Sequence, residues 1–239
     1  MKLDRLIGKH QSLGRTTAHR LIAAGRVRVA DMPVIDPQWE VDRFTTVSLD
    51  DAIIRPGDEA VFIMLHKPAG WLSATKDAQH PTVIDLIDHP LRHDLHIAGR
   101  LDRFTTGLIL LTNDGRWSKK ITEATAKVPK TYRVTTRDPI AAETVEIFAQ
   151  GIPLHPEGIT TLPAQLAITA DHTAELTIWE GRHHQIKRMF LHVGNAVVAL
   201  HRQSIGNLRL PSSLLEGTSC ALSAEQQLAA ITSPEPSFG

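Results

Sequence analysis

The chain has 239 residues, and 26 Lys and Arg side chains balance 26 Asp and Glu side chains, so the formal net charge is zero. A hydrophobic fraction of 42% and a charged fraction of 22% are typical of a globular protein and exclude a disordered or fibrous chain. A single cysteine, Cys220, excludes an internal disulfide framework and a zinc site built on several thiolates.

The N-terminal part of the chain carries two helical patterns followed by strand patterns. Apolar residues recur at helical spacing until Gly14, and a second helix is expected to begin at a cap formed by residues 16–17 and to end at Gly25. The alternating residues 27–29 predict a strand, and Asp and Pro at 31–33 predict a turn after it.

The remaining residues mix strand and helix patterns. Strands are expected over 61–65, 108–112, 131–136, 166–169, 174–179 and 196–200. Helices are expected over 83–87, 139–150, 185–193 and 224–231. Because these do not alternate as regular strand–helix–strand units, the pattern predicts an α+β fold with a mixed or antiparallel sheet. Pro and Gly at 56–57 mark a boundary, so we divide the chain into residues 1–58 and 59–239.

The zero net charge is a cancellation between separate segments. Residues 1–30 carry seven cations and one anion, whereas residues 31–60 carry eight acids and two cations. Residues 100–137 carry nine cations against three acids, and residues 181–202 carry four cations and no acid. One short basic run is more often a solvated face, but three separated runs favour a surface that binds nucleic-acid phosphates.

Segment 99–115 holds the residues most suggestive of chemistry. It places Arg100 and Asp102 on a loop before the apolar strand 108–112, and a polar loop backed by a rigid strand is a common way to position a reacting group. Taken alone, an Asp in this position more often caps the backbone of a turn than carries a reaction. The patterns in the rest of the chain are therefore needed to interpret it.

Several further segments carry distinctive residues in a fixed order. They are Arg5, Gly14-Arg15, Leu21-Ile22 and Gly25-Arg26-Val27, then His66-Lys67-Pro68-Ala69-Gly70, His80-Pro81-Thr82-Val83, Lys130-Thr131-Tyr132, Glu180 to Met189, and Val198 to Gly206. With segment 99–115 they resemble the pseudouridine synthases of the RsuA type, which isomerise uridines in ribosomal RNA, over nearly the whole chain. The resemblance implies a small S4-like RNA-binding domain over residues 1–58. It implies a pseudouridine synthase catalytic domain over residues 59–239, with a mixed, largely antiparallel sheet flanked by helices.

The resemblance also implies which residues carry the reaction. Uridine becomes pseudouridine when the N1–C1′ bond breaks, the base turns and C5 joins C1′, which needs no cofactor. By the family motif Asp102 is the ionised carboxylate beside the sugar, as nucleophile or as base, and Lys187 is the cation that keeps it charged. Tyr132, the only tyrosine, would stack on the target base and take part in proton transfer at C5. From the residues alone, Lys187 is better explained as a surface lysine on an amphipathic helix. Tyr132 is equally consistent with a strand tyrosine that packs in a core.

Other residues are expected to contact the RNA. Arg100 would fill the space that the target base leaves or grip a phosphate, and Leu200 would form an apolar wall of the pocket. Arg182 and Arg202, from the last basic segment, are expected to bind RNA. The phosphate contacts expected in the S4-like domain are Arg15, Arg20, Arg26 and Arg28.

By resemblance the target is small-subunit rRNA. His80-Pro81-Thr82 and His184-Gln185 are similar to the small-subunit enzyme, and the tail after Arg209 lacks the basic extension of some large-subunit relatives. The alternatives are a synthase for large-subunit (23S) rather than small-subunit (16S) rRNA, or a non-catalytic RNA-binding or ribosome-assembly protein on the same scaffold. A hydrolase using Asp102 would need a second carboxylate, and none is well placed in the sequence.

Two positions depart from the family pattern: His66 stands where Asn is usual, and Phe104 where an acid or Asn is common. His183, His184 and His192 lie close along the chain, but no acid or thiol lies at ligand spacing, so no metal is expected.

With no apolar run of membrane-spanning length and no signal peptide, we expect a cytoplasmic monomer that has no membrane partner. Its partner would be structured ribosomal RNA, naked or in a partly assembled subunit.

Overall fold

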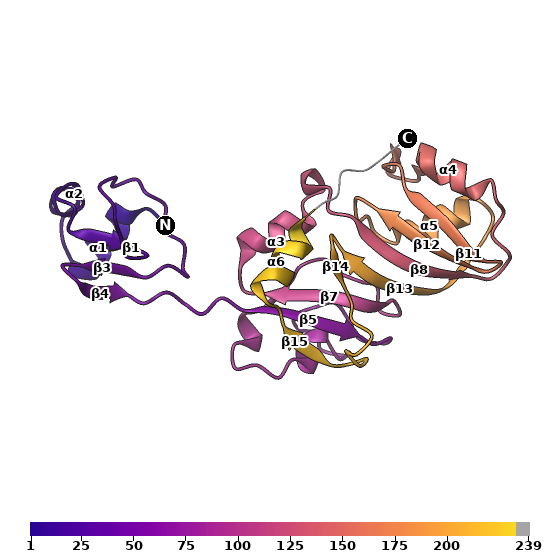
Figure 1. The fold of residues 1–239 in the computed structure, drawn as a ribbon, viewed down its shortest axis with the longest axis horizontal. Helices are drawn as coiled ribbons and strands as arrows, with labels where there is room; N and C mark the ends of the chain where they lie inside the picture. Colours follow the sequence, from indigo (N-terminus) through magenta and orange to yellow (C-terminus); the bar gives the residue numbers. More distant parts are fainter. Residues whose placement is uncertain (233–239) are drawn as a thin grey trace. The chain divides into compact units, whose positions relative to one another are not determined.

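The computed structural model describes residues 1–232 and divides the chain into two compact units, Met1–Ala60 and Val61–Gly239 (Figure 1). The division lies two residues beyond the boundary expected from the sequence. None of the helices within residues 1–232 combines the length and the apolar composition that a membrane crossing requires.

The first unit combines two helices with a four-stranded antiparallel sheet of order β2-β1-β3-β4. Its elements are α1 (Leu3–Gln11), α2 (Arg15–Ala23), β1 (Val27–Val29), β2 (Met32–Pro33), β3 (Val47–Leu49) and β4 (Ala52–Arg55). The apolar faces of helices and sheet share one core, in which Leu3, Ile7 and Ile22 are fully buried. This core explains the helical spacing of the first apolar residues.

Two local expectations for this unit are wrong. Helix α2 begins at Arg15 with Gly14 as its N-cap, so the threonines at 16–17 lie inside the first turn and cap nothing. The β1–β2 hairpin turns at Ala30 and Asp31, both with positive φ, one residue before the expected turn. Asp tolerates this conformation, which matches the twist of a tight hairpin, and Pro33 continues into β2.

The second unit is built on one mixed sheet of order β11-β12-β8-β13-β7-β5-β15. Its strands are β5 (Phe62–Lys67), β7 (Thr106–Thr112), β8 (Lys130–Thr136), β11 (Gln165–Ala170), β12 (Thr173–Ile178), β13 (Val197–Ile205) and β15 (Ser219–Ala221), with the short β6 (His96–Ile97) and β14 (Leu208–Arg209) beside them and a separate pair, β9 (Pro153–Leu154) and β10 (Ile159–Thr160). Neighbours in the main order are antiparallel except β13 and β7, which are parallel. The predicted α+β class with a mixed, largely antiparallel sheet is confirmed.

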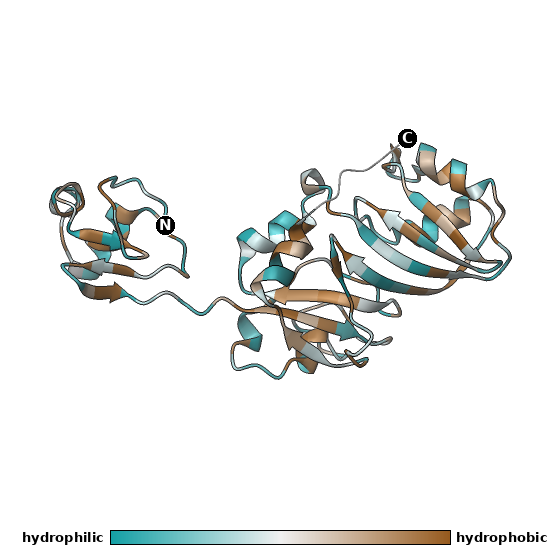
Figure 2. Ribbon diagram, viewed as in Figure 1, coloured by the Kyte–Doolittle hydropathy of each residue, from teal (hydrophilic) through white to brown (hydrophobic). Residues whose placement is uncertain are grey.

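Helices and 3-10 turns pack against this sheet, and at β7 they cover both of its faces. They are α3 (Gly115–Thr122), α4 (Thr144–Gln150), α5 (Gln185–His192) and α6 (Ala224–Ile231), with 3-10 turns η1 (Val83–Leu86), η2 (Arg92–Asp94) and η3 (Ala124–Ala126). Leu108 and Leu110 of β7 pack in the core under α3 and α6, whereas Ile109 and Leu111 pack with η1. Burial on both sides explains why residues 108–111 of β7 are all apolar, and Figure 2 shows most of this strand in brown.

A second core joins β8 and β12 to α4 and α5. Phe148 of α4 and Phe190 of α5 meet edge to face with ring centroids 5.1 Å apart, and Ile186 and Met189 complete the buried face of α5. Because one face of α5 is fixed in this way, its position relative to the sheet is set by packing.

Two elements differ from the sequence prediction. Helix α4 begins at Thr144 rather than at residue 139, because the preceding backbone is bound elsewhere: Ile140 N–H donates to Asp171 O, and the Asn195 side chain bonds to Asp138. Strand β13 continues to Ile205, five residues beyond its apolar run, because it pairs with β8 on one side and β7 on the other.

Candidate active site

The loop 99–105 between β6 and β7 carries Asp102 at a partly exposed position. Leu101 and Thr105 are buried on either side, whereas Asp102 keeps 27% of its side-chain surface exposed. Two basic side chains reach its carboxylate: Lys187 Nζ lies 3.0 Å from Oδ2, and His184 Nε2 lies 3.5 Å from Oδ1. The structure thus places Asp102 and Lys187 together and adds His184, which the sequence did not assign to this site.

Lys67, the last residue of β5, holds this loop from within the protein. Its side chain is fully buried, and Nζ donates to the carbonyl oxygens of Pro68 (3.0 Å), Arg103 (2.9 Å) and Thr105 (2.8 Å). These bonds use all three ammonium donors and tie the residues that follow Asp102 to β5. Burial lowers the pKa of Lys67 to about 8, and the charge of Asp102 opposes this shift.

This lowered pKa makes the stability of the second unit depend on pH. Between about pH 8 and pH 10.5, the unfolded chain binds a proton at Lys67 that the folded protein has lost, so the free energy of unfolding rises with pH. Lys67→Met removes this titration. We expect the wild type to gain up to about 3 kcal/mol over Lys67→Met across this range. Urea denaturation of both proteins at several pH values measures the difference, and parallel stability curves would contradict it.

A second loop, residues 68–82, clamps the Asp102 loop from another direction. The buried Ser73 hydroxyl donates to Leu101 O (2.7 Å) and accepts from Leu101 N–H (3.0 Å). Gly70 N–H donates to Arg103 O at 2.9 Å, and Arg103 Nε donates back to Gly70 O at 3.1 Å. With Lys67, these bonds fix the backbone on both sides of Asp102, as preorganised catalysis requires.

A buried carboxylate, Glu180, organises the segment that delivers Lys187 and His184. Glu180 accepts from Leu162 N–H (2.8 Å) and Gln185 Nε2 (3.0 Å) on one oxygen, and from Arg182 Nε (2.9 Å) on the other. His184 follows in a left-handed conformation as the N-cap of α5. This network sets where α5 starts, and hence where Lys187 meets Asp102.

Arg202 is placed differently from the expectation that it binds RNA. Only 2% of its surface is exposed, and its guanidinium donates to Leu108 O (2.7 Å), Gly99 O (2.8 Å) and, at longer range, Arg100 O (3.5 Å) and the Tyr132 hydroxyl (3.4 Å). The expectation is therefore corrected, because these donors are turned inward to backbone carbonyls of the Asp102 loop and β7. Arg202 therefore holds the Asp102 loop to β7 and β13, and almost none of its surface is exposed.

The close approach of β13 to β7 at Arg202 requires a glycine. Gly107 pairs with Arg202 in the parallel ladder and has φ of 106°. A Cβ at this position would lie 2.3 Å from the carbonyl oxygen of Arg202, so no other residue fits without moving a strand.

The other site residues that the sequence predicts in the second unit differ in how far they are buried. Tyr132 is 7% exposed and packs in the core with Leu101, its ring 5.9 Å from the Arg202 guanidinium carbon. Leu200 packs partly buried against the same core. Arg100 is exposed on the Asp102 loop, and Arg182 keeps 42% of its side chain exposed while paired with Glu180.

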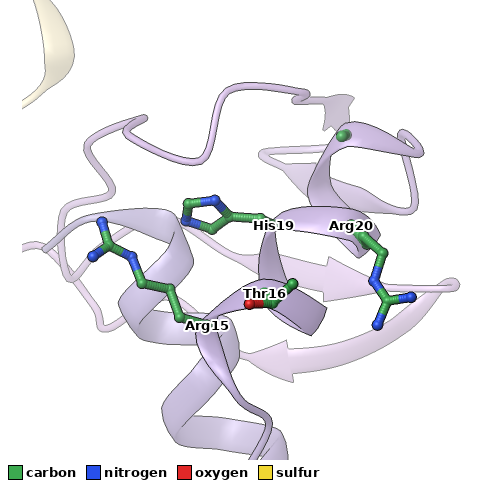
Figure 3. Close-up of a pocket in the computed structure, with 5 residues that line it drawn as sticks. Arg15, Thr16, His19 and Arg20 are labelled. Carbon is green, nitrogen blue, oxygen red and sulfur yellow. The ribbon is translucent and has the colours of Figure 1, made fainter.

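In the first unit, α2 lines a pocket with two arginines. Figure 3 shows Arg15 and Arg20 extending in opposite directions, with His19 and Thr16 between them. The buried Asp4 lies 3.1 Å from His19 Nε2 and 3.4 Å from Arg15 Nε, and the His19 hydrogen bond is the main reason why its pKa is lowered. These contacts orient the polar face of α2.

The other two expected arginines of this unit lie near its sheet. Arg26 forms a forked ion pair with Asp50, so its charge is partly neutralised by the acidic segment, whereas Arg28 is exposed on β1. Within residues 1–232 no group of three or more His, Cys, Asp or Glu side chains is arranged to hold a metal ion.

Known proteins are similar to this chain over most of its length. A model of the family described as RNA pseudouridylate synthase matches residues 61–192, which include Asp102 and Lys187. A protein of Pseudomonas aeruginosa named ribosomal small subunit pseudouridine synthase A is 46% identical over 226 residues, covering 95% of this chain and 98% of that protein. The protein of the same name from Escherichia coli is 41% identical with the same coverage.

A solved structure has a similar fold over almost the whole chain. It is described as a crystal structure of pseudouridylate synthase, has a TM-score of 0.70 and 38% identity, and the match covers 96% of this chain and 99% of the other. Identity at this level over this length shows common ancestry of both sequence and fold. The chain therefore belongs to the RNA pseudouridylate synthase family.

Proposed function

We propose that this enzyme isomerises a uridine of small-subunit rRNA to pseudouridine, with Asp102 as its catalytic carboxylate. The observation that carries the proposal is the contact of Asp102 with Lys187 and His184 on a loop that buried bonds hold in place. The small-subunit target is supported by the names of the relatives from Pseudomonas aeruginosa and Escherichia coli, each matched over 98% of its length.

In the proposed reaction each group near Asp102 has a separate task. The carboxylate acts at the ribose as the N1–C1′ bond breaks, and the ammonium of Lys187 stabilises its negative charge at 3.0 Å. Tyr132, steadied by Arg202, meets the uracil ring while it turns, Leu200 forms an apolar wall, and Arg100 takes the space that the base leaves. The base rejoins the same sugar through C5, so the reaction is an isomerisation that consumes no second substrate.

We further propose that the first unit is an S4-like RNA-binding domain. The pocket on α2, with Arg15, Arg20 and His19, offers donors for phosphate oxygens, and Arg26 and Arg28 add positive charge. Because phosphate contacts position an RNA with little sequence readout, this unit would supply affinity and the second unit would supply chemistry.

Replacing Arg15 and Arg20 together with Ala is expected to weaken binding to small-subunit rRNA. Each lost phosphate contact flattens the dependence of log affinity on log salt by about 1. Because Asp4 at 3.4 Å already neutralises part of the charge of Arg15, we expect the slope to change by between about 1 and 2. Filter binding between about 50 and 200 mM salt measures it. The control is Arg92→Ala with Arg209→Ala, which removes the same charge from exposed sites of the second unit. Equal slopes for the two double variants would contradict the proposal.

We also propose that the enzyme acts as a monomer in the cytoplasm, on structured rRNA or a partly assembled subunit. The monomer is supported by the contacts of Asp102 with Lys187 and His184, which all come from one chain. The cytoplasmic setting and the rRNA partner are supported by the relatives named ribosomal small subunit pseudouridine synthase A.

Tritium release from 5-tritiated uridine tests the proposed activity, because the C5 hydrogen leaves when C5 joins C1′. We expect release from a small-subunit rRNA transcript and none from a large-subunit transcript. Release from the large-subunit transcript alone would contradict the proposed target, and no release from either transcript or from partly assembled small subunits would contradict the activity.

A further inference from the structure

Phe104 is an aromatic side chain that the fold leaves in solvent. Its exposed fraction is 70%, whereas every other Phe, Trp and Tyr within residues 61–232 is buried or partly buried. A single exposed apolar side chain is common on protein surfaces and means little by itself. Phe104 differs in two respects: its backbone lies beside Asp102, and neighbouring residues restrain its ring.

The backbone presents Phe104 beside Asp102. Thr105 N–H donates to Asp102 O at 3.1 Å, so residues 102–105 form a tight turn with Arg103 and Phe104 at its tip. Thr105 is buried and its carbonyl is held by Lys67. The ring therefore projects from a fixed turn that also holds the proposed catalytic carboxylate.

Arg103 further restrains the ring. Its guanidinium carbon lies 5.5 Å from the Phe104 centroid, and the guanidinium donates to Gly70 O (3.1 Å) and His80 Nε2 (3.3 Å). Asp77 in turn accepts from the His80 backbone N–H at 2.8 Å. An exposed ring that is already restrained loses little conformational freedom when a partner stacks on it.

The proposed reaction supplies such a partner. A uridine in structured RNA must leave its base stack before its sugar can reach Asp102, and enzymes that turn bases out commonly place apolar side chains against the disrupted stack. Aromatic rings stack on any base, and Arg103 beside the ring complements the negative phosphates.

We propose that Phe104 stacks on an RNA base adjacent to the target uridine and so stabilises the opened RNA while the uridine occupies the Asp102 site. This inference rests on the proposed function. It makes Phe104 a residue of the Asp102 loop that contacts the RNA substrate.

The test is single-turnover tritium release from the small-subunit rRNA transcript at saturating enzyme, for the wild type, Phe104→Ala, Phe104→Leu and Phe104→Trp. We expect Phe104→Ala to lower the rate constant about 10-fold or more, because base–aromatic stacking is lost. Phe104→Leu keeps apolar bulk without a stacking face and is expected to be slow as well. Phe104→Trp is expected to stay within about threefold of the wild type. Leu215→Ala, at a side chain that is also 70% exposed, is the matched control and is expected to leave the rate unchanged.

The outcomes separate this inference from the proposed function. A wild-type rate for Phe104→Ala or Phe104→Leu, with an active wild type, would overturn the stacking role and leave the activity standing. Absence of tritium release by the wild type from both the transcript and partly assembled small subunits would overturn both. Thermal unfolding of each variant is expected to match the wild type, because the replaced side chain is exposed.

Discussion

Replacing Asp102 with Asn is expected to lower tritium release from small-subunit rRNA by at least about 10⁴-fold, because the amide can act neither as a nucleophile nor as a base. Asn has nearly the same shape, and the loop is held by backbone contacts of Lys67 and Ser73, so the fold should be retained. Single-turnover assays at saturating enzyme measure the loss.

RNA binding is the control for Asp102→Asn. Removing a carboxylate from a surface that meets phosphates lowers repulsion, so filter binding should show an affinity equal to or higher than that of the wild type. Turnover by Asp102→Asn at a rate near that of the wild type would contradict the assignment of Asp102.

The second large effect is expected for Lys187→Met. Without the ammonium at 3.0 Å, the Asp102 carboxylate loses its main partner for charge and position. A misplacement of about 1 Å can cost about 10²-fold in rate, so we expect a loss of this order at saturating enzyme. Lys187→Arg keeps the cation and is expected to lose less.

The salt dependence of binding separates this role from a phosphate contact. Because Lys187 is already paired with Asp102 in the free enzyme, it should release little counterion when RNA binds, and the salt slope should stay unchanged in Lys187→Met. A flattened slope together with a normal rate at saturation would show that Lys187 serves only to bind RNA.

The fold was predictable where local pattern and burial agree. Residues 108–111 have an uninterrupted apolar sequence, and both faces of β7 are covered there. Strand β13 was predicted only to residue 200, because His201 and Arg202 give no strand signal and owe their conformation to pairing with β7 and β8. Long-range partners of this kind leave no trace in a local window.

Part of the candidate site was predictable from the sequence, but the buried residues that hold the site in place were not. The motifs singled out Asp102 and Lys187, which the structure places 3.0 Å apart. Arg202 was misjudged because a charged residue in a basic segment is normally exposed, and only the fold supplies the inward carbonyls that bind it. Sequence reasoning also missed the buried roles of Lys67 and Glu180. A lysine at the end of an apolar strand and an acid directly before a basic helix were the available signals.

The most direct test of the central claim is a map of pseudouridines in both rRNAs from cells with the gene deleted, complemented either by the wild type or by Asp102→Asn. We predict that one pseudouridine disappears from the small-subunit rRNA on deletion, returns with the wild type and stays absent with Asp102→Asn. An unchanged small-subunit map after deletion, or restoration of the pseudouridine by Asp102→Asn, would contradict the account.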